Sequence, residues 1–161
     1  MTVMARETMD QVLGEIEPLL QMHFAEIAHY QDIPLDPDMG VYRAVEQAGG
    51  LRIWTARSDG VLVGYAIFFV RQAVHYRGSR QAVQDILFVV PEKRGSTVGP
   101  RLISYCDNAL RDEGVQVVYH HSKAAHDFGS LLKRLGYQLV DHIYARRLDH
   151  GRDSNSNRGI L

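Results

Sequence analysis

The sequence predicts an α+β (mixed α/β) fold in which helices flank a mixed, mostly antiparallel sheet. Three strand-like runs, at residues 51–57, 61–73 and 82–90, follow one another with short turns between them, as antiparallel strands do. A helical segment separates the third run from another strand at residues 115–119, which is the order of a βαβ crossover. Two helical segments precede the first of these strands.

The length of 161 residues suits one domain, which we predict to span residues 1–148. Residues 149–161 are polar and are predicted to form a disordered tail.

The net charge of −1 predicts no general attraction to nucleic acid or to an anionic membrane. One cysteine, Cys106, allows no intramolecular disulfide, and residues 1–14 lack the apolar core of a signal peptide. The cysteine count therefore predicts a cytoplasmic protein. The longest apolar run, residues 61–70, is too short to cross a bilayer as a helix and is predicted to be a buried strand.

The two N-terminal helices are predicted from apolar spacing and from a cap. Residues 7–29 carry apolar side chains at helical intervals, and Pro18 within this run predicts a kink or a division into two helices. Asp38 is the predicted N-cap of a short helix at residues 39–48, which Gly49 and Gly50 end.

The remaining elements follow from turn residues and from changes in apolar period. Ser58, Asp59 and Gly60 predict a tight hairpin turn between the first two strands, and the third strand runs up to Pro91. A helix is predicted at residues 101–113, the next strand at 115–119, and a helix at 127–135 with Gly136 as its C-cap. Residues 137–148 are predicted to form the last strand.

Residues 88–102 carry the chemistry: a strand stops at a proline, enters a basic loop containing glycines, and is followed by a helix. Backbone N–H groups of such a loop, with the positive end of the helix dipole, can bind a pyrophosphate, and Lys93 and Arg94 add positive charge. A plain surface loop is the alternative. Rossmann and Walker loops fit less well, because the glycines lack the GxGxxG spacing and Pro100 follows Gly99.

The same string resembles motif A of the GNAT acetyltransferases, V-x-P-x-x-[RQ]-G-x-G-x-[GA]. The matching positions are Val89, Pro91, Arg94, Gly95, Val98 and Gly99. Residues 125–137, which end Leu-Lys-Arg-Leu-Gly-Tyr, resemble the motif B helix of that family. Together with the order of elements the resemblance covers residues 7–148, and residues 35–148 look most like small acetyltransferases carried by phages and prophages.

This resemblance implies an acyl-CoA-dependent N-acyltransferase with a splayed central strand pair, in which a primary amine attacks acetyl-CoA or another acyl-CoA directly within a ternary complex. The implied cofactor-binding residues are Phe88, Val89, Val90, Arg94, Gly95, Ser96, Thr97, Val98, Gly99 and Pro100. Two positions depart from the family pattern. Thr97 stands where the motif has its middle glycine, and Leu132 stands where many members have a tyrosine that protonates the thiolate.

Asp85 is the preferred candidate for the general base, because it interrupts an apolar strand four residues before Val89. The alternative is a carboxylate that pairs with an arginine or caps the hairpin. His121 and its neighbour His120 are further candidates for proton transfer, and a backbone amide at Val89 or Val90 is the expected oxyanion donor.

Tyr144 and Tyr119 are candidates for the acid that protonates the thiolate, since both lie on predicted strands beside the expected thiol pocket. Tyrosines on strands are more often core residues. We predict no metal site, because His120 and His121 are consecutive strand residues and so point to opposite faces.

The acceptor is predicted to be a small-molecule amine or a protein lysine, recognised by the loops at residues 30–42 and 75–77. A CoA-binding module without catalysis is the rival hypothesis, since Thr97 and Leu132 depart from the family. A phage-type modifier of nucleic acid or of a host protein is a third hypothesis, less favoured, which Arg71, Arg77 and Arg80 prompt. We expect no membrane partner, and a homodimer stays open.

Overall fold

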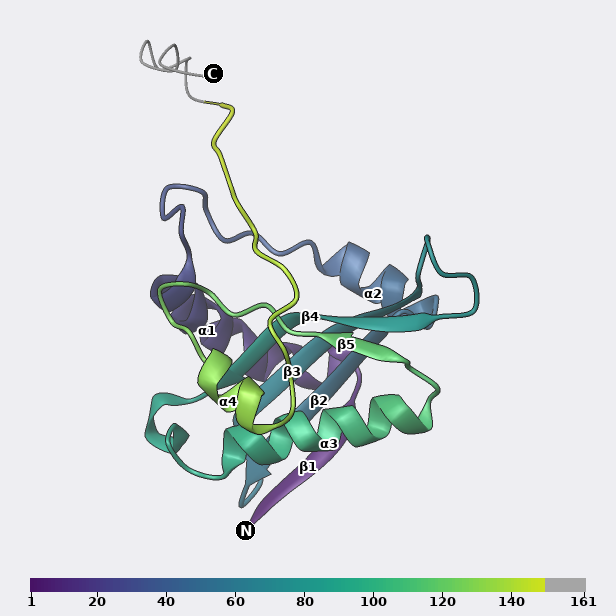
Figure 1. Cartoon of the computed structure of the whole chain (residues 1–161). Helices are drawn as coiled ribbons and strands as arrows, with labels where there is room; N and C mark the ends of the chain where they lie inside the picture. Colours follow the sequence, from purple (N-terminus) through teal and green to yellow (C-terminus); the bar gives the residue numbers. More distant parts are fainter. Residues whose placement is uncertain (150–161) are drawn as a thin grey trace.

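The computed structural model of the chain describes residues 1–149 and has a five-stranded sheet at its centre (Figure 1). The strands are β1 (Thr2–Glu7), β2 (Leu51–Ser58), β3 (Val61–Gln72), β4 (Arg80–Val89) and β5 (Val117–Tyr119), and they lie in this order across the sheet. Every neighbouring pair is antiparallel except β4 and β5, which are parallel. The predicted fold class is therefore confirmed. Of the predicted tail, all but Asp149 lies outside the described residues.

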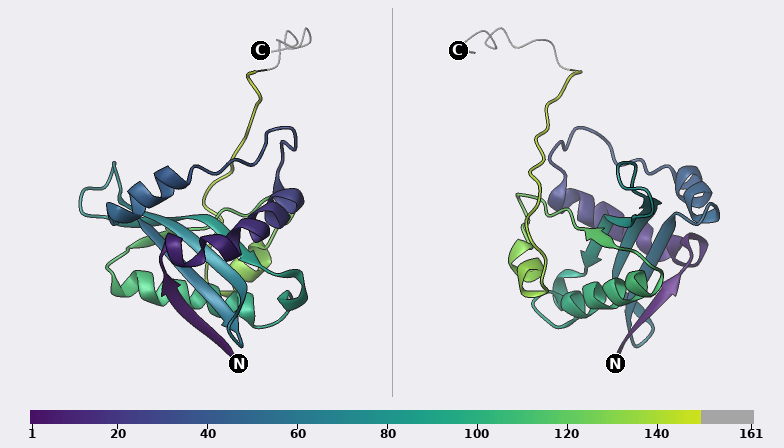
Figure 2. Two further views of the ribbon diagram at one scale, coloured as in Figure 1. Left: turned by 180° about the vertical axis from the view of Figure 1, so that it is seen from behind. Right: turned by 45° about the vertical axis from the view of Figure 1, so that its right-hand side comes forward.

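Helices cover both faces of the sheet, as the two views of Figure 2 show. The helices are α1 (Met9–Ile27), α2 (Met39–Gln47), α3 (Val98–Asp112) and α4 (Gly129–Arg134). The core under α1 and α2 contains Met9, Ile16, Tyr65, Ile67 and Phe88, while the core under α3 contains Trp54, Phe68, Leu102, Cys106 and Leu110. Residues of one strand alternate between the two cores, as the period of two along a strand requires.

The edge strand β1 is absent from the predicted elements. It pairs with β2 from Thr2 opposite Ser58 to Glu7 opposite Ile53. The sequence pattern does not predict this strand because it contains charged residues. An edge strand needs only one apolar face and can carry charge on the other. Thr8 then caps α1 in a capping box with Gln11, so that strand and helix are joined by a single residue.

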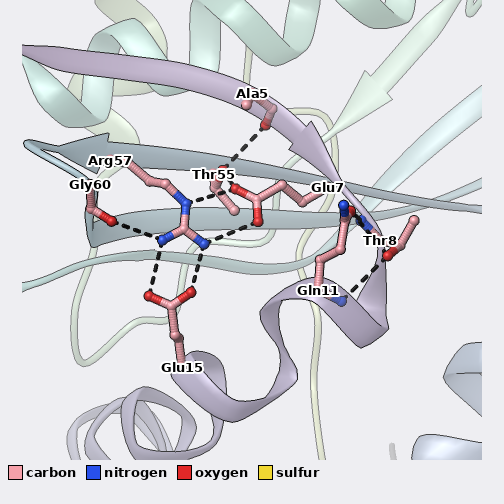
Figure 3. A network of polar contacts seen from close by, with 8 residues as sticks. All are labelled: Ala5, Glu7, Thr8, Gln11, Glu15, Thr55, Arg57 and Gly60. Atoms are coloured by element: carbon pink, nitrogen blue, oxygen red, sulfur yellow. Dashed lines mark hydrogen bonds and ion pairs between the residues drawn. The ribbon is translucent and has the colours of Figure 1, made fainter.

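Arg57 ties β1, the β2–β3 hairpin and α1 together (Figure 3). Its guanidinium donates two hydrogen bonds to Glu7, at 2.8 and 3.0 Å, and two to Glu15 of α1, at 3.0 and 2.7 Å. A fifth, at 3.1 Å, reaches the carbonyl of Gly60. All five N–H donors of the side chain are thus satisfied, and the N-terminal strand and helix are held in one geometry.

Helix α1 is a single helix, so the division that Pro18 predicts does not occur. Pro18 removes one backbone hydrogen bond. Met9 and Ile16 before it are fully buried against the sheet, and Leu19 and Leu20 after it pack on the same core. The apolar contact on both sides of the proline outweighs the lost bond.

The cap of α2 and the hairpin turn form as predicted. Asp38 accepts a hydrogen bond from the Val41 amide at 3.0 Å. In the turn, Asp59 and Gly60 have φ angles of 50° and 85°, which a two-residue hairpin with the right-handed strand twist requires.

The prediction of a last strand at residues 137–148 is wrong. The segment forms neither helix nor strand and leaves the body of the fold (Figure 1). Five large apolar side chains along it are exposed: Leu139, Val140, Ile143, Tyr144 and Leu148. Alternating residues favour a strand only if a neighbour supplies the ladder of hydrogen bonds, and the adjacent strand β5 is three residues long. Within residues 1–149, no helix has the length and apolar character needed to span a membrane.

Candidate functional site

The two parallel strands at the edge of the sheet separate where the chemistry is expected. Strand β5 pairs with β4 only from Gln81 to Val83, whereas β4 continues to Val89. The Val90 amide donates to the Val63 carbonyl of β3 at 3.0 Å, so it is not available to a ligand. Because successive residues of an antiparallel strand direct their N–H groups to opposite sides, the Val89 N–H faces away from β3, into the opening.

A β-bulge places Asp85 at this opening. Ile86 pairs with Ile67 of β3 and Gln84 pairs with Phe68, which leaves Asp85 as the extra residue without a partner opposite. The bulge turns its side chain out of the regular alternation, so that Gln84 is buried while Asp85 is exposed to the opening. The sequence signal, a carboxylate inside an apolar strand, thus corresponds to a specific backbone irregularity.

The carboxylate of Asp85 accepts a hydrogen bond from the hydroxyl of Tyr42, in α2. Neighbouring protein displaces part of its hydration, and this desolvation raises the pKa of Asp85 above the ordinary range for aspartate, although the Tyr42 bond and nearby His121 act in the opposite direction. Desolvation, with the adjacent carboxylate, also raises the pKa of Tyr42, which therefore keeps its proton. The arginine partner of the alternative interpretation is not present among the described residues.

A cleft of about 660 Å³ opens in front of Asp85, and we call it the main cleft. Strand β4 forms its floor, α1 contributes His23 and Glu26, and the segment after β5 contributes His121, Lys123 and His126. His23 lies against Phe88 with 5.1 Å between ring centroids, and burial lowers the pKa of His23. Sequence reasoning missed His23 as a cleft residue, because its spacing reads only as part of the apolar face of α1.

Arg94, the first residue of the loop at residues 94–100, lines the main cleft, and the loop is exposed from Arg94 to Thr97. Gly95 has a φ of 74°, in the left-handed region that glycine adopts most easily. Among the described residues, no acceptor is bound to the backbone N–H groups of Gly95, Ser96, Thr97 or Gly99. These open donors stand at the positive end of the 15-residue helix α3 and therefore fit a pyrophosphate.

Thr97 and Gly99 show why the loop tolerates its departure from the family pattern. Thr97 has φ −79° and ψ −4°, a conformation that any residue adopts, so the absence of glycine there causes no strain. A Cβ atom on Gly99 would meet only the Val89 side chain, at 3.9 Å, so the backbone conformation and packing at this position do not require glycine.

Arg94 is paired within the protein. Its Nε donates to the Val89 carbonyl at 2.9 Å, and its Nη2 lies 2.8 Å from Glu26 of α1. The guanidinium also lies over the Phe88 ring, 5.5 Å from the centroid. Arg94 thus fastens the loop to the end of β4 and to α1, and Glu26, 68 residues away, is a partner that local sequence does not reveal.

The remaining predicted residues divide between the cleft and other places. His121 lines the main cleft together with Asp85. His120 points into the core, where its Nδ1 lies 2.7 Å from Gln84 Oε1 and burial lowers its pKa to about 4. Tyr144 does not line the main cleft and is 92% exposed, so the structure does not bring it to the site. In the described range, no three His, Cys, Asp or Glu side chains gather as a metal site would require.

A second cavity, of about 370 Å³, lies between α1, α2 and the connection between them, and we call it the apolar cavity. Its lining includes Ile16, Leu20, Phe24, Ile33, Leu35 and Tyr42. It adjoins the main cleft, because the Tyr42 hydroxyl that reaches Asp85 belongs to a residue of its wall. The prediction that residues 30–42 face the acceptor places the acceptor in this region.

Comparisons with known proteins agree with this geometry. Residues 49–139 match the family model of the acetyltransferase (GNAT) domain. A comparison with curated protein sequences found no match.

Three solved structures illustrate the shared fold. A ribosomal-protein-alanine N-acetyltransferase from Brucella melitensis biovar Abortus 2308 is similar with a TM-score of 0.69 at 20% identity, over 91% of this chain and 99% of that one. An aminoglycoside acetyltransferase from an uncultured soil metagenomic sample, in complex with sisomicin, gives 0.67 at 15% identity, over 91% and 97%. An acetyltransferase with acetyl-CoA from Clostridium acetobutylicum gives 0.67 at 13% identity, over 92% and 97%.

Proposed function

The chain belongs to the GNAT family of acetyltransferases, which use acetyl-CoA, and we propose that it moves the acetyl group to a primary amine by direct attack within a ternary complex. One arrangement supports this most strongly: Asp85 and Arg94 line the same cleft, and the open N–H groups follow Arg94 directly in the 94–100 loop. A candidate base thus faces the cleft from which a candidate anion cradle continues, and amine acetylation with this donor requires both.

Each group has a role that its geometry supports. The open N–H groups of the 94–100 loop would hold the pyrophosphate, and Val89, with its N–H in the opening, would stabilise the developing oxyanion. When bound, acetyl-CoA supplies an activated acyl carbon. Asp85, ionised, would take a proton from the substrate ammonium, which frees the nitrogen lone pair for attack, and its raised pKa makes it a better base than a free aspartate.

His121 is the proposed proton donor for the sulfur that leaves. The nitrogen loses two protons in all. Asp85 would take the first before the attack and release it later to solvent. His121 would protonate the sulfur as the carbon–sulfur bond breaks and then take the second proton from the nitrogen, so that atoms and charges balance. His121 lines the same cleft as Asp85, and an imidazole can carry the proton. Leu132 is 8% exposed and packs in the interior, so it has no part in this transfer.

The rival hypothesis of an inactive CoA-binding module makes a different prediction. Acetyl-CoA would raise the melting temperature under either hypothesis, by roughly 5–11 °C at a hundred times its Kd. Release of free thiol with a panel of amines would occur only for the enzyme. Binding without thiol release would favour the module.

The finer predictions stay proposals. A protein lysine remains a second acceptor class, and a phage-type modifier of nucleic acid is not favoured, since Arg80 is engaged by the Glu113 carbonyl at 2.9 Å. A phage origin and a cytoplasmic location remain predictions from the sequence. A homodimer is supported by the exposed apolar side chains of residues 139–148.

Asp85→Asn is the direct test of the proposed base. We expect kcat to fall by roughly 100-fold or more, with acetyl-CoA binding retained, because the amide cannot accept a proton but keeps the shape of the side chain. Asp107→Asn is a matched control: Asp107 also accepts a hydrogen bond from a tyrosine, Tyr137, and burial raises its pKa, but it does not line the main cleft. Equal losses of kcat in both variants would remove Asp85 as the base.

A further inference from the structure

The apolar cavity contains little that a polar acceptor could bind. Asp36 is the one charged residue in its described lining, and among its other members only Tyr30 and Tyr42 have polar side-chain atoms. Its volume of about 370 Å³ falls within the range of small-molecule sites, roughly 300–1,000 Å³. Tyr42, a residue of its wall, donates a hydrogen bond to Asp85, the carboxylate beside which an amine would be acetylated.

We propose that the acceptor is a primary monoamine with an alkyl or arylalkyl substituent, which the apolar cavity binds while the ammonium group reaches Asp85. This inference rests on the proposed function and adds its substrate class. A monoamine of this kind has one cationic end and one apolar end. The two surfaces it needs, one carboxylate and one apolar cavity, adjoin each other at Tyr42.

Other acceptor classes would leave polar groups without partners in this cavity. A polycationic sugar would need several carboxylates, and a sugar phosphate would need basic side chains, which the described lining does not contain. A peptide would bring backbone amides, and side chains such as Leu20, Phe24 and Ile33 cannot bind them. Each unpaired buried polar group disfavours binding, so the lining selects against these classes.

The cover of the cavity is held in place from outside. Ile33 and Leu35 belong to the connection between α1 and α2, and Arg147 of the C-terminal segment fastens that connection. Its Nη1 lies 2.9 Å from Asp32, and its guanidinium lies over the Tyr30 ring, 5.2 Å from the centroid. These contacts hold the connection in position as one wall of the apolar cavity.

A series of straight-chain amines from propylamine to octylamine tests the proposal in the unaltered protein. If the substituent enters the apolar cavity, each added methylene should lower KM by roughly 4-fold until the cavity is full. Phenethylamine should be acetylated with at least 10-fold higher kcat/KM than sisomicin, glucosamine 6-phosphate or a peptide with a free N-terminal alanine. A KM independent of chain length would overturn the proposal.

A pair of variants on one helix locates the binding. Leu20→Asn places an amide in the cavity and should raise the KM for hexylamine about 10-fold, with the KM for acetyl-CoA unchanged. Met22→Asn is the control, because Met22 is exposed on the same helix and does not line the cavity. If Leu20→Asn does not fold, Leu35→Asn, in the connection, tests the same wall. Equal KM values in the cavity variant and the control would contradict the proposal.

Failure of the inference can be distinguished from failure of the proposed function. Calorimetric titration of hexylamine into the CoA-saturated protein measures occupation of the cavity without turnover. If hexylamine binds, Leu20→Asn weakens that binding and no amine causes thiol release, the apolar cavity is the binding site but the protein is not an acetyltransferase of these amines. Fast acetylation of sisomicin or of the peptide, with no binding of hexylamine, would retain the enzyme and overturn the substrate class.

Discussion

At the scale of single residues, Asp85 combines two properties that a general base needs. The bulge in β4 gives it access to the main cleft, and partial desolvation raises its pKa. Tyr42 opposes the second effect, because its hydrogen bond stabilises the ionised carboxylate. Under the proposed function, the balance between these two effects sets the pH at which Asp85 becomes active as the base.

Tyr42→Phe should therefore move the acidic limb of the kcat/KM profile to higher pH. The base acts only when ionised, so activity falls as the pH drops through the pKa of Asp85. Loss of the Tyr42 hydrogen bond raises that pKa further, by roughly 0.5 to 1 pH unit for a bond worth about 1 kcal/mol. Tyr137→Phe, which removes the equivalent bond to Asp107 outside the cleft, should leave the limb in place. If the acidic limb of Tyr42→Phe does not move, the pKa that it reports does not belong to Asp85.

Sequence reasoning reached Asp85 but not its partner. A carboxylate within an apolar strand is a local signal. The contact with Tyr42 crosses 43 residues and depends on how α2 packs on the sheet, and the same holds for Glu26 and Arg94. Tyr144 was placed beside the cleft only through a strand that does not form.

At the scale of elements, the start of α3 joins a helix dipole to a loop with open N–H groups. The Val89 side chain bounds the space beside Gly99, 3.9 Å from where a Cβ atom on that residue would lie, so a single methyl group fits there. A charge does not, because it would oppose the phosphates at the same place.

Gly99→Asp should therefore abolish the rise in melting temperature that acetyl-CoA produces, whereas Gly99→Ala should retain most of it. The comparison separates the effect of charge from the effect of size. Differential scanning fluorimetry across an acetyl-CoA titration measures both variants. A normal response in Gly99→Asp would mean that the pyrophosphate binds elsewhere.

Arg57 joins three elements, and its removal tests their coupling. Its hydrogen bonds lower the pKa of Glu7 and of Glu15, so both carboxylates stabilise the fold when ionised. Arg57→Met should lower the free energy of unfolding at pH 7 by roughly 1–3 kcal/mol. Below about pH 4.3, the pKa of a free glutamate, the original protein loses this contribution as both groups take up protons, so the difference should shrink.

Urea denaturation at pH 7 and at pH 3 measures this difference. Arg43→Met is the matched control, since Arg43 pairs with one exposed carboxylate, that of Asp10, and should cost less than about 0.5 kcal/mol. If Arg57→Met lowers the free energy of unfolding by the same amount at both pH values, the ion pairs of Arg57 with Glu7 and Glu15 do not account for the loss.

Element prediction succeeded where the signal is local and failed where it depends on a partner. The cap at Asp38 and the turn at Asp59 and Gly60 follow from side-chain chemistry and backbone preference. Strand β1 forms because it pairs with the edge of β2, and the sequence of residues 2–7 alone does not predict that pairing. Residues 137–148 have the pattern of a strand but no ladder to join.

At the scale of the whole molecule, residues 139–148 leave an apolar surface exposed, and a second copy of the chain would cover it under the proposed homodimer. Arg147 holds the far end of this segment against the cover of the apolar cavity. Under the two proposals, association and acceptor binding would be connected through one segment.

Ile143→Asp combined with Tyr144→Asp should convert the proposed dimer into a monomer that still folds, because both side chains are exposed in the single chain. Sedimentation velocity over a range of concentrations measures the mass. Val74→Asp, at another exposed apolar position, should leave the mass unchanged. A monomer at every concentration of the original protein would contradict the dimer.

The contact of the main cleft and the apolar cavity at Tyr42 and Asp85 has a consequence for inhibition. A bisubstrate compound, in which an alkylamine is joined to CoA through a two-carbon bridge, would fill both spaces at once. Such a compound loses its freedom of translation and rotation only once, so its affinity should greatly exceed that of either half. Because of its alkyl half, the compound should bind this protein more tightly than homologous enzymes whose acceptor sites are hydrophilic.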